Sequence, residues 1–487
     1  LKFDVRYALI QDLSAQTVTF RNFAGQRALP MRQLGSFLPG DGVGGAAVHW
    51  NGQTWRFQPE WFRLRSWVNE KYGADFLGPE VTIQDWGVTY EELEPHYAFF
   101  EKVMGIAGLP AVIGGETRSG GNPFEGPRSG PYPNPPMKES YSGRLFAEGA
   151  RKLGYTPFPV PSANSTTHYV NPYGAKMNPC MYCGFCERFG CEHFAKASPQ
   201  VNILPFALKN ANYELRTRAN VIRIETDRQA RRATGVTYVD AQGRETFQPA
   251  NMVALCAFAH HNPILMLQSG IGEPYDPATR QGVVGRNYTY QTMTGATVFY
   301  DGALRINPFM GAGALGTAID DFNNGSFDHS GLGFIGGGYI AAYQTNGRPI
   351  YHHPVPEGTP RWGLNWKRAV RRHYNSTVGV SFHGSSTPHP NNYVGLDRAY
   401  SDAWGQPLGM ITFDFPHNDR LMARYITEKT MGIAQAMGGR SVLVSWLDDH
   451  YSIVPYQTTH NTGGAVMGAD PRTSVVNRYL QIGRAHV

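Results

Sequence analysis

The chain has 487 residues, enough for a large core and two or three domains, with charged residues at only 17%, 56 glycines and 13% aromatic residues. This composition excludes a disordered or fibrous chain, and no run of 18 apolar residues predicts a membrane span. The net charge of +6 comes from scattered basic residues without a basic helix or a stacking-aromatic motif, so we expect no nucleic-acid partner.

A glycine-rich loop covers residues 38–57. Its Gly40, Gly42 and Gly45 match the G-x-G-x-x-G pattern of dinucleotide-binding loops. That pattern should follow a hydrophobic strand and open a helix, whereas Leu38 and Pro39 precede the loop and no helix-compatible run follows it. We therefore interpret the loop either as a turn that lets the backbone approach a flat cofactor or as a purely structural turn.

Two amphipathic helices are predicted in the next part of the chain. Residues 89–105 have helical spacing and a glutamate-rich first turn, and residues 141–154 form the second helix. The segment between them, residues 107–140, is rich in proline and glycine, so we expect a long irregular loop there.

Four of the five cysteines lie within twelve residues. Cys180, Cys183 and Cys186 occupy every third position, and Cys191 follows five residues later. Thiolates this close together usually hold metal, and C-x2-C-x2-C is a spacing of iron–sulfur ligation, whereas zinc sites usually pair their ligands on separate loops. Two local disulfides, or four free thiols, would also account for these cysteines. The fifth, Cys256, lies in an apolar run and is expected to be buried.

The second half of the chain predicts mainly strands. Residues 213–239 have the pattern of two or three strands, and the apolar run 251–258 is typical of a buried parallel strand. A helix is expected over 262–272, ending at Gly270. Residues 290–450 predict strands and long loops, with a helix near 418–437.

The C-terminal run 459–476, which begins Thr-His-Asn-Thr-Gly-Gly, resembles the signature of the glucose–methanol–choline (GMC) oxidoreductases. Three other segments are similar to parts of that family in the right order. They are the glycine loop from Gly42 to Asn51, the strand 220–224, and the pair of turns at 269–272 and 284–287. These anchors span nearly the whole chain.

The resemblance implies an α/β (overall α+β) fold, with a discontinuous, doubly wound FAD-binding domain and a substrate domain that contains an antiparallel sheet. It also implies a division of the chain into six parts. These are FAD-binding segments at 1–66 and 196–289, a substrate or cap region at 67–176, the cysteine loop at 177–195, the substrate-domain sheet at 290–450, and a C-terminal FAD-binding segment with the catalytic histidine at 451–481. Residues 482–487 resemble the translation of a sequencing-library adapter, so we expect them to be a non-native tail.

The family's functional positions can be assigned residue by residue. The resemblance implies that His460 is the catalytic base, because histidine has a pKa near neutrality and can take the proton of an alcohol while hydride moves to the flavin. His49 is a weaker candidate near the flavin. The residues expected to contact FAD are Gly42, Gly44, Gly45, His49, Asn51, Val221 and Asp470, and the metal ligands are Cys180, Cys183, Cys186 and Cys191.

The cysteine run narrows the resemblance to the bacterial acceptor-linked dehydrogenases of sugar acids, the gluconate and 2-ketogluconate group. Such enzymes hold a [3Fe-4S] cluster through three cysteines. The expected partners are a sugar-acid substrate, a cytochrome c subunit and a small export or assembly subunit, with peripheral attachment to the periplasmic face of the inner membrane through those partners. No C-x-x-C-H haem motif occurs in the chain, so we expect any haem to lie on a partner.

Two alternatives to a sugar-acid substrate stay open. The same class of enzyme can act on sugars or alcohols such as sorbitol, fructose or glucose, or the chain can be an inactive zinc-loop binding protein on a GMC scaffold. The resemblance also leaves the family's first nucleotide-binding unit and its last FAD-binding turn unmatched. We therefore expect this chain to be a fragment lacking both ends.

Overall fold

The computed structural model describes residues 17–37, 40, 42–229, 232–301, 304–345, 352–456 and 458–482. Its largest sheet has six antiparallel strands in the order β17-β11-β14-β13-β12-β5. These strands are β5 (Phe158–Pro159), β11 (Thr292–Phe299), β12 (Gly316–Ile319), β13 (Gly338–Tyr343), β14 (Thr377–Gly384) and β17 (Ser441–Ser445). The antiparallel sheet predicted between residues 290 and 450 is therefore present.

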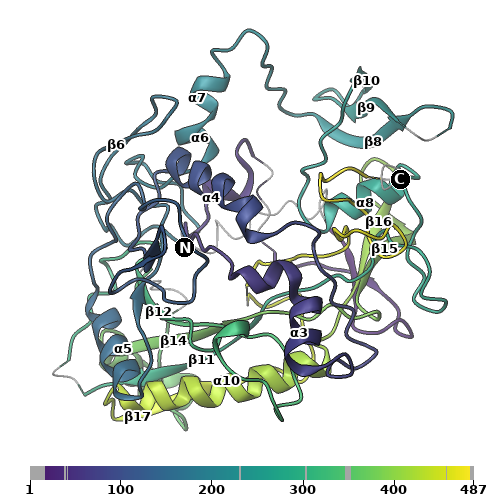
Figure 1. Ribbon diagram of the computed structural model, residues 1–487. Coiled ribbons are helices and arrows are strands. Elements are labelled where there is room, and N and C mark those ends of the chain that lie inside the picture. Colours follow the sequence, from purple (N-terminus) through teal and green to yellow (C-terminus); the bar gives the residue numbers. More distant parts are fainter. Residues whose placement is uncertain are drawn as a thin grey trace.

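Two long helices cover one face of this sheet. They are α5 (Tyr141–Lys152) and α10 (His417–Ala436), and Figure 1 shows α10 running along β11 and β14. Their apolar side chains pack on alternate residues of the strands, among them Val380 and Phe382 of β14 and Ile340 of β13. Because successive side chains of a strand point to opposite faces, the residues between these core positions face away from α10. That second face carries the candidate site.

A smaller sheet has the order β15-β16-β1-β2. It is built from β1 (Thr19–Arg21), β2 (Leu29–Pro30), β15 (Tyr393–Ser401) and β16 (Pro407–Thr412), and β1 pairs with β16 in parallel. Its buried core includes Ile411 and Phe413. A three-stranded antiparallel sheet of β8 (Asn220–Thr226), β9 (Ala233–Val239) and β10 (Glu245–Pro249) lies nearby, with α8 (His261–Gln268) packed on β8. The strands expected over 213–239 are thus confirmed.

The remaining elements are short apart from three helices. Helix α4 starts at a capping box formed by Thr89 and Glu92 and ends at Gly105 in the left-handed conformation, so the helix predicted over residues 89–105 is present. The other elements are η1 (Gly45–Val48), η2 (Pro59–Arg63), α3 (Leu64–Tyr72), α4 (Tyr90–Met104), β3 (Val112–Ile113), β4 (Glu116–Thr117), β6 (Tyr169–Val170), β7 (Lys176–Met177), α6 (Pro199–Asn202), α7 (Leu204–Ala207), η3 (Asn324–Ser326) and α9 (Gly363–His373). No helix among the described residues is both long and apolar enough to cross a membrane.

The apolar run 251–258 is not the buried strand that the sequence predicts. Met252 is 83% exposed, Cys256 is exposed, and the segment has no strand structure. A buried parallel strand needs hydrogen-bonded neighbours at its edges, and none of the strand pairings between described residues involves this segment. Both the strand and the buried cysteine are wrong predictions.

The helix expected after this run is present as α8, and Gly270 with its φ of 67° marks its end.

Candidate functional site

The segment that carries His460 is held in place by a second strand-like segment. The hydroxyl of Tyr290 donates to the backbone oxygen of Thr458 and accepts from its backbone N–H. Thr462 and Thr289 exchange two backbone hydrogen bonds of 3.1 and 3.0 Å. Tyr290 is 1% exposed. Buried hydrogen bonds on both sides therefore fix the backbone around His460.

His460 lies close to a second histidine, His383 of β14. Burial lowers the pKa of His460 below the ordinary histidine value, although its side chain keeps an exposed surface. A side chain that has many protein atoms around it and is still reached by solvent usually lies on a concave surface. Burial, and next the charge of His460, lower the pKa of His383 to about 3. Both imidazoles are therefore neutral at pH 7, and a neutral imidazole can accept a proton.

The glycine loop has a conformation that needs glycine. Gly44 and Gly45 have φ of 93° and 59°, and they lead into the short helix η1. Among the described residues, nothing lies within 4 Å of the place where a Gly42 side chain would project, and this open backbone fits the approach of a flat ring system such as a flavin. His49 caps η1 through its backbone, and the backbone of Asn51 packs against Gly313.

The two remaining predicted FAD contacts lie elsewhere on the chain. Val221 is on β8 and is 38% exposed, and this strand is tied to the turn after α8 by a 2.9 Å bond from the backbone N–H of Ile224 to Ser269. The carboxylate of Asp470 accepts a 2.8 Å bond from the guanidinium of Arg472. Gly285 donates a 2.7 Å backbone bond to Gly464. Segments that match the family in sequence are thus neighbours in space.

The cysteine loop wraps around a buried amide. The Asn164 side-chain N–H lies 3.8 Å from the sulfur of Cys180 and 3.7 Å from that of Cys186. Burial raises the pKa of Cys180 to about 11, with a further contribution from the neighbouring thiols of Cys186, Cys191 and Cys183. Cys183 is exposed, and all five cysteines are free. Hydrogen bonds to sulfur are typical of protein sites that hold iron–sulfur clusters.

A buried lysine joins the cysteine loop to the glycine loop. The ammonium of Lys196 donates to the backbone oxygens of Trp50, Cys186 and Phe189 over 2.6, 3.1 and 2.7 Å. Its side chain is 2% exposed. Across the described part of the chain, no three Cys, His, Asp or Glu side chains are arranged to hold a metal ion. The cluster and its four cysteine ligands therefore stay a prediction.

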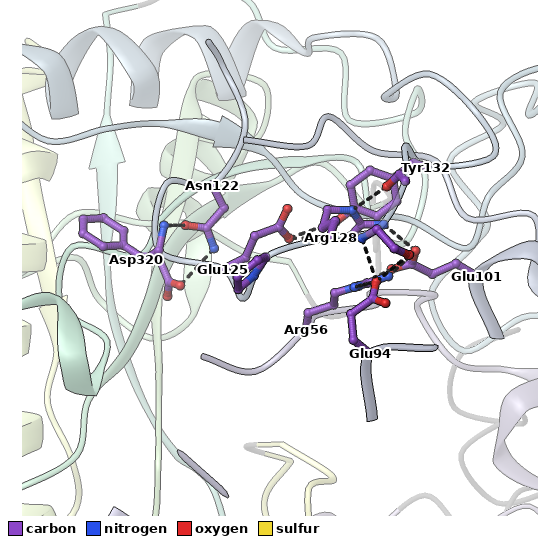
Figure 2. Close-up of polar contacts among 12 residues, drawn as sticks. Arg56, Glu94, Glu101, Asn122, Glu125, Arg128, Tyr132 and Asp320 are labelled. Atoms are coloured by element: carbon purple, nitrogen blue, oxygen red, sulfur yellow. Dashed lines mark hydrogen bonds and ion pairs between the residues drawn. The ribbon is translucent and has the colours of Figure 1, made fainter. Parts of the chain in front are cut away.

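An extended segment, residues 53–58, lies between the large sheet and α4. Trp55 stacks on Tyr339 of β13 at 4.4 Å, whereas Arg56 points the other way and pairs with Glu94 and Glu101 of α4, both at 2.9 Å. Arg128 also pairs with Glu101, and Figure 2 shows the two guanidinium groups converging on that carboxylate. This charged network ties residues 53–58 to α4.

A second polar pair lies beside this network. The side-chain amide of Asn122 donates a 3.0 Å bond to Asp320, which follows β12, and burial raises the pKa of this carboxyl to about 6. Burial also raises the pKa of Glu125 to about 7. Figure 2 shows Glu125 between this pair and Arg128. The loop 107–140, expected to be irregular, is thus fastened by buried polar contacts.

The structure adds residues that the sequence did not single out. His383, Tyr339, Tyr343 and Gln53 line the sheet face near His460. The alternation of core and non-core residues along β13 and β14 is the signal that could have found Tyr339, Tyr343 and His383. None of the sequence motifs that resemble the family includes these positions, so the motifs did not identify them.

Comparison with known proteins gives the family. Family models described as GMC oxidoreductase match residues 136–293 and 388–485. The gluconate 2-dehydrogenase flavoprotein of Pantoea cypripedii is 46% identical over 99% of this chain and 79% of that protein. The fructose dehydrogenase large subunit of Gluconobacter japonicus is 28% identical over 90% and 73% of the two chains.

Two further matches are more distant. The 2-methyl-1,2-propanediol dehydrogenase of Mycolicibacterium austroafricanum is 27% identical over 90% of this chain and 73% of its own length. A crystal structure of formate oxidase aligns with a TM-score of 0.52 at 15% identity, covering 98% of this chain and 83% of the other, which shows a shared fold. The α/β fold with antiparallel sheets is confirmed. The chain therefore belongs to the GMC oxidoreductase family, whose members use FAD to oxidise CH–OH donors.

Proposed function

We propose that this protein oxidises a hydroxyl group of a sugar acid of the gluconate type. The observation that carries the proposal is the identity of 46% over 99% of the chain with a gluconate 2-dehydrogenase flavoprotein. The other dehydrogenase relatives are only 27–28% identical and act, by their names, on fructose and on a diol. They support sugars or alcohols as the second candidate class of substrate.

In this proposal His460 takes the proton of the substrate hydroxyl. Its lowered pKa keeps it neutral at pH 7 and ready to accept that proton, and the bonds of Tyr290 and Thr289 keep its backbone in place. The glycine loop, which is open at Gly42, would hold FAD, together with His49 and Asn51. FAD, when bound, supplies the acceptor for hydride.

We further propose that the cysteine loop holds an iron–sulfur cluster, of the [3Fe-4S] type, that passes electrons to a cytochrome c subunit. The thiol spacing and the amide shared by Cys180 and Cys186 support this. The Lys196 contacts support a short route from the glycine loop to the cysteine loop. We place the protein at the periplasmic face of the inner membrane, held there by partners and exported with a small assembly subunit.

The substrate proposal predicts a ranking of donors. With an artificial electron acceptor, the complete gene product should turn over gluconate with a kcat/KM at least about tenfold above that for glucose, fructose or sorbitol. These three donors lack a carboxylate, and a missing polar contact costs about 1–3 kcal/mol. Steady-state rates with this panel and 2-ketogluconate measure it. A higher kcat/KM for a neutral sugar or polyol would replace the sugar-acid proposal with the second candidate class.

The cluster proposal predicts a composition that zinc or disulfides cannot give. The protein isolated without oxygen should contain iron and acid-labile sulfide, and Cys186→Ser should lose most of both, because Cys186 is the buried thiol of the loop. Cys256→Ser is the matched control, since this exposed cysteine lies outside the loop. Zinc without sulfide, or neither metal nor sulfide, would contradict the cluster.

A further inference from the structure

Aromatic rings form a continuous wall on the sheet face that points away from α10. Trp55 stacks on Tyr339 at 4.4 Å with 30° between the rings, and Tyr339 stacks on His383 at 4.9 Å and 9°. Tyr343 meets His383 edge-on at 6.2 Å. Tyr339 and His383 are direct partners in the register of β13 and β14. His460 is a neighbour of this wall through His383.

Two donors on this wall have no partner of normal geometry. The buried hydroxyl of Tyr343 and the buried indole N–H of Trp55 both point at the Tyr339 hydroxyl, but within the described ranges these two contacts fall short of normal hydrogen-bond geometry. The Tyr339 hydroxyl instead donates a 3.0 Å bond to Gln53. Leaving a buried donor unpaired costs about 1–3 kcal/mol. A bound ligand that accepts from both donors would remove this cost.

The hydrogen-bonding groups of the wall are uncharged. His383 is neutral at pH 7 and its ring nitrogens lie 3.1 Å from the Ser381 hydroxyl and 3.4 Å from the Gln291 amide oxygen. Burial raises the pKa of both Tyr339 and Tyr343, so both keep their protons. Neutral donors match the hydroxyl groups of a carbohydrate chain, whereas a carboxylate is better matched by a guanidinium or ammonium group.

We propose that Tyr343 and Trp55 determine specificity by donating hydrogen bonds to hydroxyl groups of the substrate's polyhydroxy chain while a neighbouring hydroxyl faces His460. The inference rests on the proposed function and names the part of the substrate that this wall binds. His383 acts as a positioning residue, since it links the wall to His460 and is itself held by Ser381 and Gln291. The substrate carboxylate then lies away from this wall.

Tyr343→Phe tests the inference, because it removes one hydroxyl and keeps the ring. We expect KM for gluconate to rise about tenfold, the cost of one lost hydrogen bond, with kcat within about threefold of the wild-type value. Tyr300→Phe is the matched control, because the Tyr300 hydroxyl bonds the backbone oxygen of Met437 on the α10 side of the same sheet. Its KM should not change.

Two more readouts separate substrate binding from a structural role. Since the Tyr343 hydroxyl has no partner of normal geometry within the described ranges, its removal should leave the thermal unfolding midpoint unchanged or higher. Single-deoxy analogues of gluconate each lack one hydroxyl group. The analogue that lacks the hydroxyl contacted by Tyr343 should have the same KM with the wild-type protein and with Tyr343→Phe.

The outcomes distinguish the inference from the proposed function. If the wild-type protein turns over gluconate while Tyr343→Phe and Tyr300→Phe share its KM, the inference is overturned and the proposed function stands. If Tyr343→Phe lowers the unfolding midpoint and raises KM equally for every deoxy analogue, the hydroxyl is structural and the inference is also overturned. If wild type turns over no polyhydroxy donor, both fall.

Discussion

Replacing His460 with asparagine is expected to lower kcat by about 100- to 10,000-fold, the usual contribution of a general base. Asparagine keeps a similar shape but cannot take the substrate proton at neutral pH. The bonds that fix this segment run through the backbone and through Tyr290, so the variant should keep its fold. Steady-state kinetics with a saturating donor and acceptor measure the loss, and the absorption spectrum verifies that FAD is still bound.

The pH profile gives an independent check on His460. Burial lowers its pKa, so the neutral, proton-accepting form persists below the pH at which a histidine with the ordinary pKa would protonate. In wild type, kcat/KM should therefore fall on the acid side only below about pH 6.5. His168→Asn, at an exposed histidine, is the control and should keep both the rate and the profile. An unchanged rate in His460→Asn would remove His460 from the chemistry.

Replacing Glu101 with glutamine is expected to lower the free energy of unfolding by about 3–5 kcal/mol, the cost of breaking a buried ion pair from one side. Glu101 is 5% exposed and is shared by the guanidinium groups of Arg56 and Arg128 (Figure 2). Losing its charge leaves two buried cations with less compensation. Urea unfolding followed by circular dichroism measures the change, and the thermal midpoint should fall with it.

Glu70→Gln supplies the matched control for this loss. Glu70 pairs with Arg63 on the surface, where both side chains are about half exposed, and such pairs contribute about 0–1 kcal/mol. If the two variants lost the same stability, the buried network would have no special role in holding residues 53–58. Glu101 also bears on the candidate site, because it pairs with Arg56, and Arg56 anchors the segment that carries Trp55.

The helices were the most predictable part of the fold. Helices α4, α5 and α10 follow from apolar residues at helical spacing and from caps such as Thr89 and Ser140. Helix α9 was missed, and the expectation that the chain has no basic helix is wrong, because the basic run 367–372 lies in α9 with its residues exposed or half-exposed. The strand at 251–258 failed because apolar composition does not supply a pairing neighbour.

The candidate site was predictable only where a motif marks it. His460 and the glycine loop stand in segments that resemble the family, and the cysteines stand out by spacing alone. The wall of Trp55, Tyr339 and Tyr343 depends on contacts between residues about 285 positions apart, and no local pattern encodes such a contact. The same holds for Asn164 beside the cysteine sulfurs.

The most direct test of the central claim is an absorption spectrum recorded during anaerobic addition of gluconate. The complete gene product, expressed with its neighbouring genes and isolated with FAD, should lose its flavin absorbance on addition of gluconate and regain it when an artificial acceptor follows. The His460→Asn variant should lose that absorbance at least about 100-fold more slowly. A bound flavin whose absorbance stays unchanged with gluconate, and with every other sugar, sugar acid and polyol tried, would contradict the account.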